Sequence, residues 1–237
     1  MDETMARRAS ELLVRNWREG TVIDALPAPL RPADRAEGYA IQALLEHAGA
    51  GAPRGWKIAA TSTAGQRHIG VDGPLAGRLL ASMVHRDGAT IALGANRMRV
   101  AEPEFAFRMG RDLAPRAEPW SVDEVMARVE ALHLAIEVPD SRFADFATAG
   151  AAQLVADNAC ADQFVLGPEA PPAWRGTDLA AHVVHGRVGD GAPREGRGSN
   201  VLGDPRIALA WIANELSRHG MTPVSYTHLT LPTNREV

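Results

Sequence analysis

Two glutamates in one predicted strand are the first residues of this chain whose types and spacing could do chemistry. Glu102 and Glu104 lie two positions apart in residues 100–109, where side chains alternate with the period of a strand. Both carboxylates then point to one face, and Phe105 and Phe107 point to the core. Like charges on one face repel each other unless a cation lies between them. The alternative is that both are ordinary solvent-facing residues.

A third carboxylate comes from residues 132–138, where Glu137 lies among apolar neighbours. The apolar members of this run are expected to face the core: Leu132, Leu134, Ile136 and Val138. Glu137 then points from the opposite face. Three carboxylates on two strands predict a site for a hard cation such as Mg²⁺ or Mn²⁺, because both ions prefer oxygen ligands.

A lysine interrupts the short apolar run of residues 55–60. Lys57 either extends its ammonium group to the surface or faces an anionic substrate as a charge or a proton shuttle. If it is buried, we expect a lowered pKa. Asp72 lies in the predicted turn of residues 70–74, where an aspartate commonly bonds the turn backbone. The run Thr61-Ser62-Thr63 is expected to cap a short helix that reaches His68.

The composition restricts the class of protein. At 237 residues, with 46% hydrophobic and 23% charged residues, the chain can form a sizeable core. A net charge of −4 does not indicate the basic surface that nucleic-acid-binding proteins use, so nucleic acid is not an expected partner. The single cysteine, Cys160, excludes an internal disulfide and a cysteine-rich zinc site. No apolar run approaches a membrane span, so the cytoplasm is the expected location.

The order of predicted elements favours an α+β fold over a doubly wound sheet. Residues 3–18 read as an amphipathic helix, and a second helix is expected from Pro32 to Gly49. Together they would form a helical N-terminal lobe, residues 1–52. Residues 53–223 would form the catalytic domain, ending with a helix that Asp204 caps and Gly220 stops.

Six short motifs carry a resemblance to a known family. They lie at residues 55–58, 70–72, 102–104, 135–138, 155–160 and 198–203. In this order and spacing the chain resembles the 2-keto-4-pentenoate hydratase and 4-oxalocrotonate decarboxylase family, within the fumarylacetoacetate hydrolase superfamily. The resemblance implies a mixed-sheet, barrel-like catalytic domain.

The same resemblance implies roles for particular residues. It implies a Mg²⁺ or Mn²⁺ site made by Glu102, Glu104 and Glu137. It implies an active-site lysine at Lys57 with an acidic partner at Asp72, and substrate contacts from Asn158 and Cys160. Many relatives have serine at the position of Cys160, and a thiol is the weaker hydrogen-bond donor. A thiol that only packs is the other role for Cys160.

The implied reaction is that of a hydro-lyase: metal-dependent hydration of a 2-hydroxy-2,4-dienoate to a 4-hydroxy-2-oxo acid in aromatic-compound degradation. The alternative is a decarboxylase of the 4-oxalocrotonate type, for which Arg142 and Arg197 are candidates to hold a second carboxylate. A further alternative is a non-catalytic partner subunit of a hydratase–decarboxylase complex. A homo-oligomer and a partner enzyme of the same pathway are expected.

The end of the chain departs from this resemblance. Relatives continue after the last helix with further strands, whereas residues 224–233 read like a translated sequencing adapter. We therefore expect a catalytic domain truncated near Pro223, with its C-terminal strands missing, and a non-native tail at residues 224–237. Unpaired sheet edges would make such a chain poorly soluble and inactive.

Overall fold

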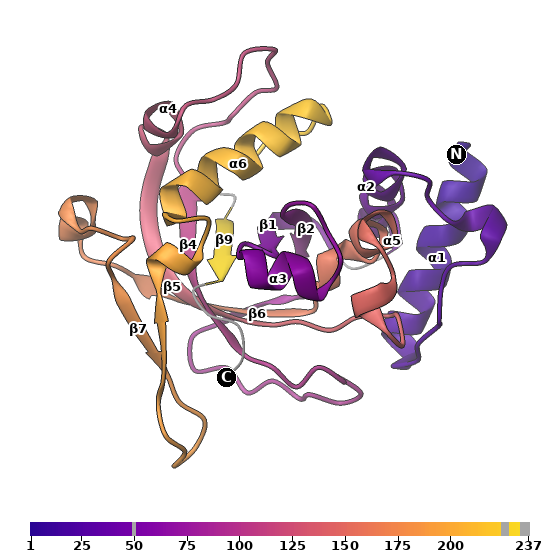
Figure 1. Ribbon diagram of the computed structural model, residues 1–237, viewed down its shortest axis with the longest axis horizontal. Helices are drawn as coiled ribbons and strands as arrows, with labels where there is room; N and C mark the ends of the chain where they lie inside the picture. Colours follow the sequence, from indigo (N-terminus) through magenta and orange to yellow (C-terminus); the bar gives the residue numbers. More distant parts are fainter. Residues whose placement is uncertain (49–50, 224–227, 233–237) are drawn as a thin grey trace.

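The computed structural model describes residues 1–48, 51–223 and 228–232, and its centre is a mixed sheet of seven strands (Figure 1). The strand order is β2-β1-β9-β4-β5-β6-β3. These strands are β1 (Pro53–Ala59), β2 (Leu75–Leu80), β3 (Val84–Arg86), β4 (Glu102–Met109), β5 (Val129–Val138), β6 (Gln163–Glu169) and β9 (His228–Pro232). A separate hairpin consists of β7 (Val183–Gly186) and β8 (Arg194–Arg197). The α+β prediction is confirmed.

Six α-helices in the described ranges accompany this sheet. They are α1 (Glu3–Glu19), α2 (Arg35–Ala43), α3 (Thr63–His68), α4 (Val122–Met126), α5 (Ala151–Ala156) and α6 (Pro205–Arg218). Figure 1 shows α1, α2 and α5 grouped on one side of the sheet and α6 lying across it. None of the helices in the described ranges is long and apolar enough to cross a membrane.

The first helix begins and ends at capping residues, whereas the second departs from its predicted bounds. Asp2 accepts a bond from the Met5 N–H at 2.8 Å, and Gly20 ends α1 in the left-handed region at φ +64°. The second helix begins later than predicted, because Asp34 and not Pro32 is its N-cap; it ends at Ala43 and a 3₁₀ turn, Leu44–Ala48, follows. The division into a lobe ending at residue 52 stays a prediction.

The N-terminal helices also bond to later parts of the chain. Gln42 of α2 donates to the carbonyls of Ala76 and Val155, both at 2.9 Å. The Leu26 N–H donates to Gln153 of α5 at 2.9 Å. These buried bonds attach the first helices to the sheet and to α5.

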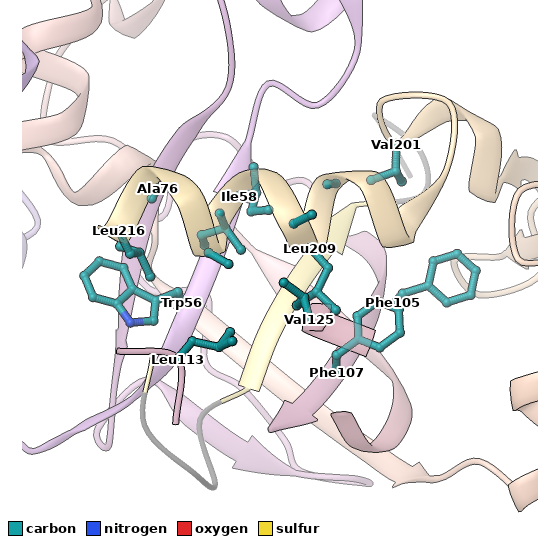
Figure 2. Packing of buried hydrophobic residues seen from close by; sticks show 14 of the residues in the cluster. Trp56, Ile58, Ala76, Phe105, Phe107, Leu113, Val125, Val201, Leu209 and Leu216 are labelled. Atoms are coloured by element: carbon teal, nitrogen blue, oxygen red, sulfur yellow. The ribbon is translucent and has the colours of Figure 1, made fainter. Parts of the chain in front are cut away.

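Helix α6 packs on one face of the sheet and forms the main core there. Asp204 caps it as predicted, and Leu209 and Leu216 on its inner side are fully buried. Figure 2 shows these leucines together with Trp56 and Ile58 of β1 and with Phe105 and Phe107 of β4, in one buried cluster. Because strand side chains alternate, Lys57 and Glu104 must point from the opposite face.

That opposite face is strongly curved. Leu79 of β2 and Phe164 of β6 belong to strands far apart in the sheet, yet they share one buried cluster with Ala106 and Ala135. The sheet therefore curls toward these residues. Its order still ends at β2 and β3, so the described strands form an open curved sheet and no closed barrel.

The expected orientation of β5 is wrong for two residues. Leu134 and Ile136 are 48% and 44% exposed, whereas Glu137 is completely buried. The alternation itself is correct, but the curved face that carries Glu137 is the interior at this point. Leu134 and Ile136 do not belong to the buried cluster that the leucines of α6 join.

The strand β9 lies inside the segment expected to be a tail. Its backbone pairs parallel with β1, with Lys57 opposite Thr230, and antiparallel with β4, with Glu104 opposite Pro232. It therefore fills the position between β1 and β4, where unpaired edges were expected. The non-native origin of residues 224–237 stays a prediction, and residues 224–227 and 233–237 lie outside the described ranges.

Deletion of residues 224–237 should destabilise the protein, because β9 contributes backbone hydrogen bonds to strands on both sides. At about 1 kcal/mol per bond, we expect the free energy of unfolding to fall by at least ~3 kcal/mol, measured by urea denaturation. Deletion of residues 233–237 alone is the control, since it retains β9. Equal unfolding midpoints for the two deletions would contradict the place of β9 in the sheet.

Candidate active site

The curved face of the sheet brings three carboxylates together. Glu102 is paired with Glu137 across β4 and β5, and Glu104 is two residues further along β4. One oxygen from each of the three lies within 4.8 Å of the others. Glu104 and Glu137 are buried, at 1% and 0% exposure. Antiparallel pairing therefore produces the cluster that the strand alternation predicted.

This cluster fits a divalent cation. Its donors are carboxylate oxygens only, which is the ligand type that Mg²⁺, Mn²⁺ and Ca²⁺ prefer. Three negative charges so close together in a buried place need more positive charge than one side chain supplies. The three carboxylates can therefore hold a metal ion.

Lys57 lies against the carboxylates and is the only lysine among the 237 residues. Its Nζ is 3.0 Å from Glu137 Oε1 and donates to the carbonyl oxygen of Ala159 at 3.1 Å. The side chain is almost fully buried. An ammonium group, unlike a guanidinium group, can release its proton at accessible pH, so a lysine suits proton transfer.

The expected lowering of the Lys57 pKa is wrong. Burial by itself disfavours the ammonium form, but the negative charges of Glu137, Glu102 and Glu104 act in the opposite direction and outweigh it. The pKa of Lys57 is therefore raised. The side chain is a charged proton donor at neutral pH in the absence of a bound cation.

The acceptor of the Lys57 bond lies in an unusual stretch of backbone. Asn158, Ala159 and Cys160 all have left-handed φ angles, of 57°, 50° and 61°. Such conformations cost about 1–3 kcal/mol each and persist where the surroundings hold them. Here Asn158 holds them, since its amide accepts from Arg78 N at 2.6 Å and donates to Arg78 O at 2.9 Å.

Gly77 makes room for this arrangement. It lies opposite Lys57 in the pairing of β1 with β2. A Cβ at Gly77 would lie 2.3 Å from the Asn158 carbonyl oxygen and 3.1 Å from Lys57 Cδ. Any side chain at this position would therefore displace the backbone that orients Lys57.

A cavity of about 480 Å³ opens beside Lys57 and Glu102. Its wall includes Cys160, the start and end of α3, and Asn200. Glu104 and Glu137 lie behind Glu102 and Lys57, away from the open space. The volume suits a small organic molecule.

Cys160 and Asn158 have different positions relative to the cavity. Cys160 lines it, and burial together with the charge of Asp157 raises the pKa of the thiol to about 12, although Lys57 and Arg142 act in the opposite direction. The thiol is therefore protonated and a poor nucleophile. Asn158 is not part of the wall, and both ends of its amide bond Arg78.

Asp72 lies apart from the other predicted site residues. Its side chain is 90% exposed and forms an ion pair with Arg35 at the start of α2. It is not part of the cavity wall. The structure therefore brings together Lys57, the three glutamates and Cys160, and it leaves Asp72 at the surface.

The two arginines considered for a second carboxylate are also engaged elsewhere. Arg142 is buried and bonds Asp157 and the Ala161 carbonyl. Arg197 is exposed and pairs with Glu195 on the hairpin. Neither lines the cavity.

Several wall residues were not recognised from the sequence as part of a site. Of the three candidate caps in residues 61–63, the structure selects Ser62, whose Oγ accepts from Gly65 N at 3.0 Å; the helix ends at His68 as predicted. The capping signal located this helix, but only the packing places Ser62 and His68 at the cavity. Met98 comes from a loop held by Asp140, which accepts from the Met98 N–H at 3.3 Å.

Comparison with known proteins gives close agreement in both sequence and fold. No protein-family model matches the chain. It is 33% identical over 215 residues to 2-keto-4-pentenoate hydratase 1 of Dechloromonas aromatica (strain RCB), covering 90% of this chain and 80% of that one. It is 34% identical over 230 residues to the 2-keto-4-pentenoate hydratase of Burkholderia vietnamiensis (strain G4 / LMG 22486), covering 94% and 84%.

Among solved structures, the fold is similar to that of 4-oxalocrotonate decarboxylase from Pseudomonas putida G7 complexed with magnesium and adipate. The TM-score is 0.85 at 22% identity, and the match covers 99% of this chain and 91% of that one. The same decarboxylase complexed with calcium and acetate gives a TM-score of 0.83. At this identity the likeness concerns the fold.

Cys160 should react slowly with thiol reagents in the folded protein. With its pKa raised to about 12, the reactive thiolate is scarce at pH 8, and we expect alkylation by iodoacetamide to be about 10³-fold slower than for an ordinary cysteine. Mass spectrometry over time measures the rate. The unfolded chain in urea is the control and should react at the ordinary rate; equal rates in the two states would contradict the raised pKa.

Proposed function

The chain belongs to the 2-keto-4-pentenoate hydratase family, and from this we propose that it hydrates a 2-hydroxy-2,4-dienoate to a 4-hydroxy-2-oxo acid in the degradation of aromatic compounds. The observation that carries the proposal is the buried cluster of Lys57 with Glu102, Glu104 and Glu137 at one end of a cavity. The reaction is that of a hydro-lyase. Both named relatives are 2-keto-4-pentenoate hydratases.

The proposed cofactor is Mg²⁺ or Mn²⁺, held by Glu102, Glu104 and Glu137. When bound, the ion would supply Lewis-acid stabilisation of the negative charge that develops on the C2 oxygen of the substrate. The glutamates contribute orientation, because β4 and β5 are paired at this point and two of the three carboxylates are fully enclosed. The decarboxylase of similar fold was solved with magnesium and with calcium.

Lys57 is the proposed proton donor. The Ala159 carbonyl and Glu137 hold the ammonium group at the wall of the cavity, where its pKa is raised in the absence of a bound cation. Transfer of a proton to the substrate carbon converts the dienol into an α,β-unsaturated ketone. The hydroxyl proton of the dienol passes to solvent, and Lys57 is left as a neutral amine. Water then adds at the conjugated carbon and gives a proton to this amine, so that the restored positive charge of Lys57 balances the enolate until it takes up a proton from solvent.

The proposed roles of the remaining residues differ from one another. Cys160 lines the cavity and can contact substrate as a neutral thiol. Asn158 acts through the backbone that it holds and not by direct contact. Asp72 would reach the cavity only if its ion pair with Arg35 opened, so we assign it no step.

Decarboxylation is the second candidate, because the solved structure of similar fold is a decarboxylase. Both reactions pass through an enolate held at the same place, and a 4-oxalocrotonate substrate brings a second carboxylate. Arg142 and Arg197 are both engaged away from the cavity, which favours hydration. A non-catalytic partner subunit would have no need of the buried glutamates and lysine.

The proposal also includes a homo-oligomer located in the cytoplasm, with a partner enzyme of the same pathway. These points rest on the family resemblance. Light scattering of the purified protein alone measures self-association. Light scattering of its mixture with a decarboxylase of the same pathway measures association with a partner enzyme.

The test of the proposed function uses 2-hydroxypenta-2,4-dienoate with Mg²⁺, followed by the loss of dienol absorbance and by identification of 4-hydroxy-2-oxopentanoate. 4-Oxalocrotonate is assayed in parallel for released CO₂. Hydration of the first without CO₂ from the second supports the proposal, and the reverse result supports the decarboxylase.

In the same assay, Glu104→Ala should abolish metal-dependent hydration and weaken Mg²⁺ binding, because one of three ligands is lost. The metal-free variant should be at least as stable as the parent, since repulsion within the cluster falls. Glu130→Ala is the matched control: Glu130 is an exposed glutamate of β5 that pairs with Arg108. If Glu104→Ala retained full Mg²⁺ affinity, the ligand assignment would be wrong.

Lys57→Met should lower kcat by about 10²–10⁴-fold, the usual contribution of a positioned proton donor. Mg²⁺ affinity should stay the same or rise, because the ammonium group competes for Glu137. The metal-free variant should lose about 3–5 kcal/mol of stability, since Glu137 loses its buried partner. Calorimetry and thermal unfolding measure these effects. Equal losses of kcat and Mg²⁺ affinity would instead make Lys57 a support of the metal site.

A further inference from the structure

The cavity extends well beyond the lysine and the glutamates. In the pairing of β1 with β2, Lys57 is opposite Gly77 and Ala59 is opposite Leu75. Ala59 and Leu75 therefore lie on the same curved face as Lys57, about 7 Å further along the strands. Both belong to the cavity wall.

This more distant part of the wall is apolar. Leu75, Leu154 and Ile69 are buried, at 1%, 0% and 8% exposure, and come from β2, from α5 and from the end of α3. Half-buried Phe146 completes this side, with its ring centroid 5.9 Å from that of His68. These four residues, which we call the distal pocket, all line the cavity.

The cavity is too large for the smallest substrate of the proposed reaction. Its volume of about 480 Å³ corresponds to roughly 16 water molecules at ~30 Å³ each, whereas a five-carbon dienoate has about eight non-hydrogen atoms. A molecule whose carboxylate end lies beside Lys57 and the proposed cation site at Glu102 thus leaves the distal pocket unfilled. A longer chain would fill it.

The charges of the wall restrict what that chain can end in. The described wall contains no arginine, and its lysine is already paired with Glu137. Cys160 is a neutral thiol and His68 lies at the exposed rim against Phe146. A second carboxylate in the distal pocket would lose its hydration without gaining a fixed positive partner, which is unfavourable.

We propose that the distal pocket makes this site selective for 2-oxo and 2-hydroxy acids that end in an apolar substituent, and against those that end in a second carboxylate. The inference rests on the proposed function for the assignment of the carboxylate end to Lys57 and Glu102. It adds Leu154 and Phe146 as specificity-determining residues.

The test measures binding and does not require turnover. With Mg²⁺ present, isothermal titration calorimetry gives the Kd of 2-oxobutanoate, 2-oxohexanoate, 2-oxooctanoate and 2-oxoadipate. We expect affinity to rise about fourfold per added methylene, as for burial of apolar surface. 2-Oxoadipate, with the same number of carbons as 2-oxohexanoate, should bind at least ~10-fold more weakly.

Two variants and one control locate the effect. Leu154→Ala should reduce the advantage of 2-oxooctanoate over 2-oxobutanoate by about 10-fold, because part of the distal pocket is removed. Leu132→Ala is the matched control: Leu132 is a buried leucine of the same hydrophobic core that does not line the cavity, so the ratio should not change. Phe146→Lys, at a half-buried position, should shift preference toward 2-oxoadipate by about 10-fold.

A Kd that does not depend on chain length, or equal affinity for 2-oxoadipate and 2-oxohexanoate, would overturn the inference. So would a change in the ratio with Leu132→Ala as large as that with Leu154→Ala. If the binding pattern holds while no dienoate is hydrated, the distal pocket is supported and the proposed function fails. The two conclusions are therefore separable.

Discussion

Three carboxylates and one ammonium group in a buried place constrain the rest of this structure. The carboxylate oxygens lie within 4.8 Å of one another, where each pair repels by about 3 kcal/mol or more at an effective dielectric constant of ~20. Lys57 compensates part of this repulsion through its contact with Glu137. The remaining negative charge is what gives the cluster its affinity for a divalent cation, and it also keeps the lysine protonated.

The strands around the cluster serve to hold these charges in place. Glu102 and Glu137 come from paired strands, and Lys57 comes from β1, which β9 links to β4. The left-handed backbone of residues 158–160 then orients the ammonium group, and it costs several kcal/mol that the Asn158 bonds and the space at Gly77 help to offset. Strain of this kind next to a cavity is consistent with a site that must present one carbonyl oxygen in a defined direction.

The two faces of the sheet have different roles: one forms the hydrophobic core and the other forms the candidate active site. On one face, α6 and the aromatic residues of β1 and β4 form the core shown in Figure 2. On the curved face, polar groups meet an open cavity whose far wall is again apolar. A small acid can thus be held by charge at one end and by apolar contact at the other, which is the arrangement that distinguishes related substrates by their tails.

The sequence by itself determined the local features: the alternation that puts Glu102 and Glu104 on one face, the capped starts of α3 and α6, and the motif order that indicates the family. Local signals suffice for these because they depend on neighbours within a few residues. Only the tertiary structure decided that the curved face of β5 is interior, so that Glu137 is buried while Leu134 and Ile136 are exposed. It also decided that Lys57 has a raised pKa, since three carboxylates from other strands surround it, and that Asp72 pairs with Arg35 at the surface. These properties depend on the curvature of the sheet and on contacts between distant segments, which no local pattern encodes.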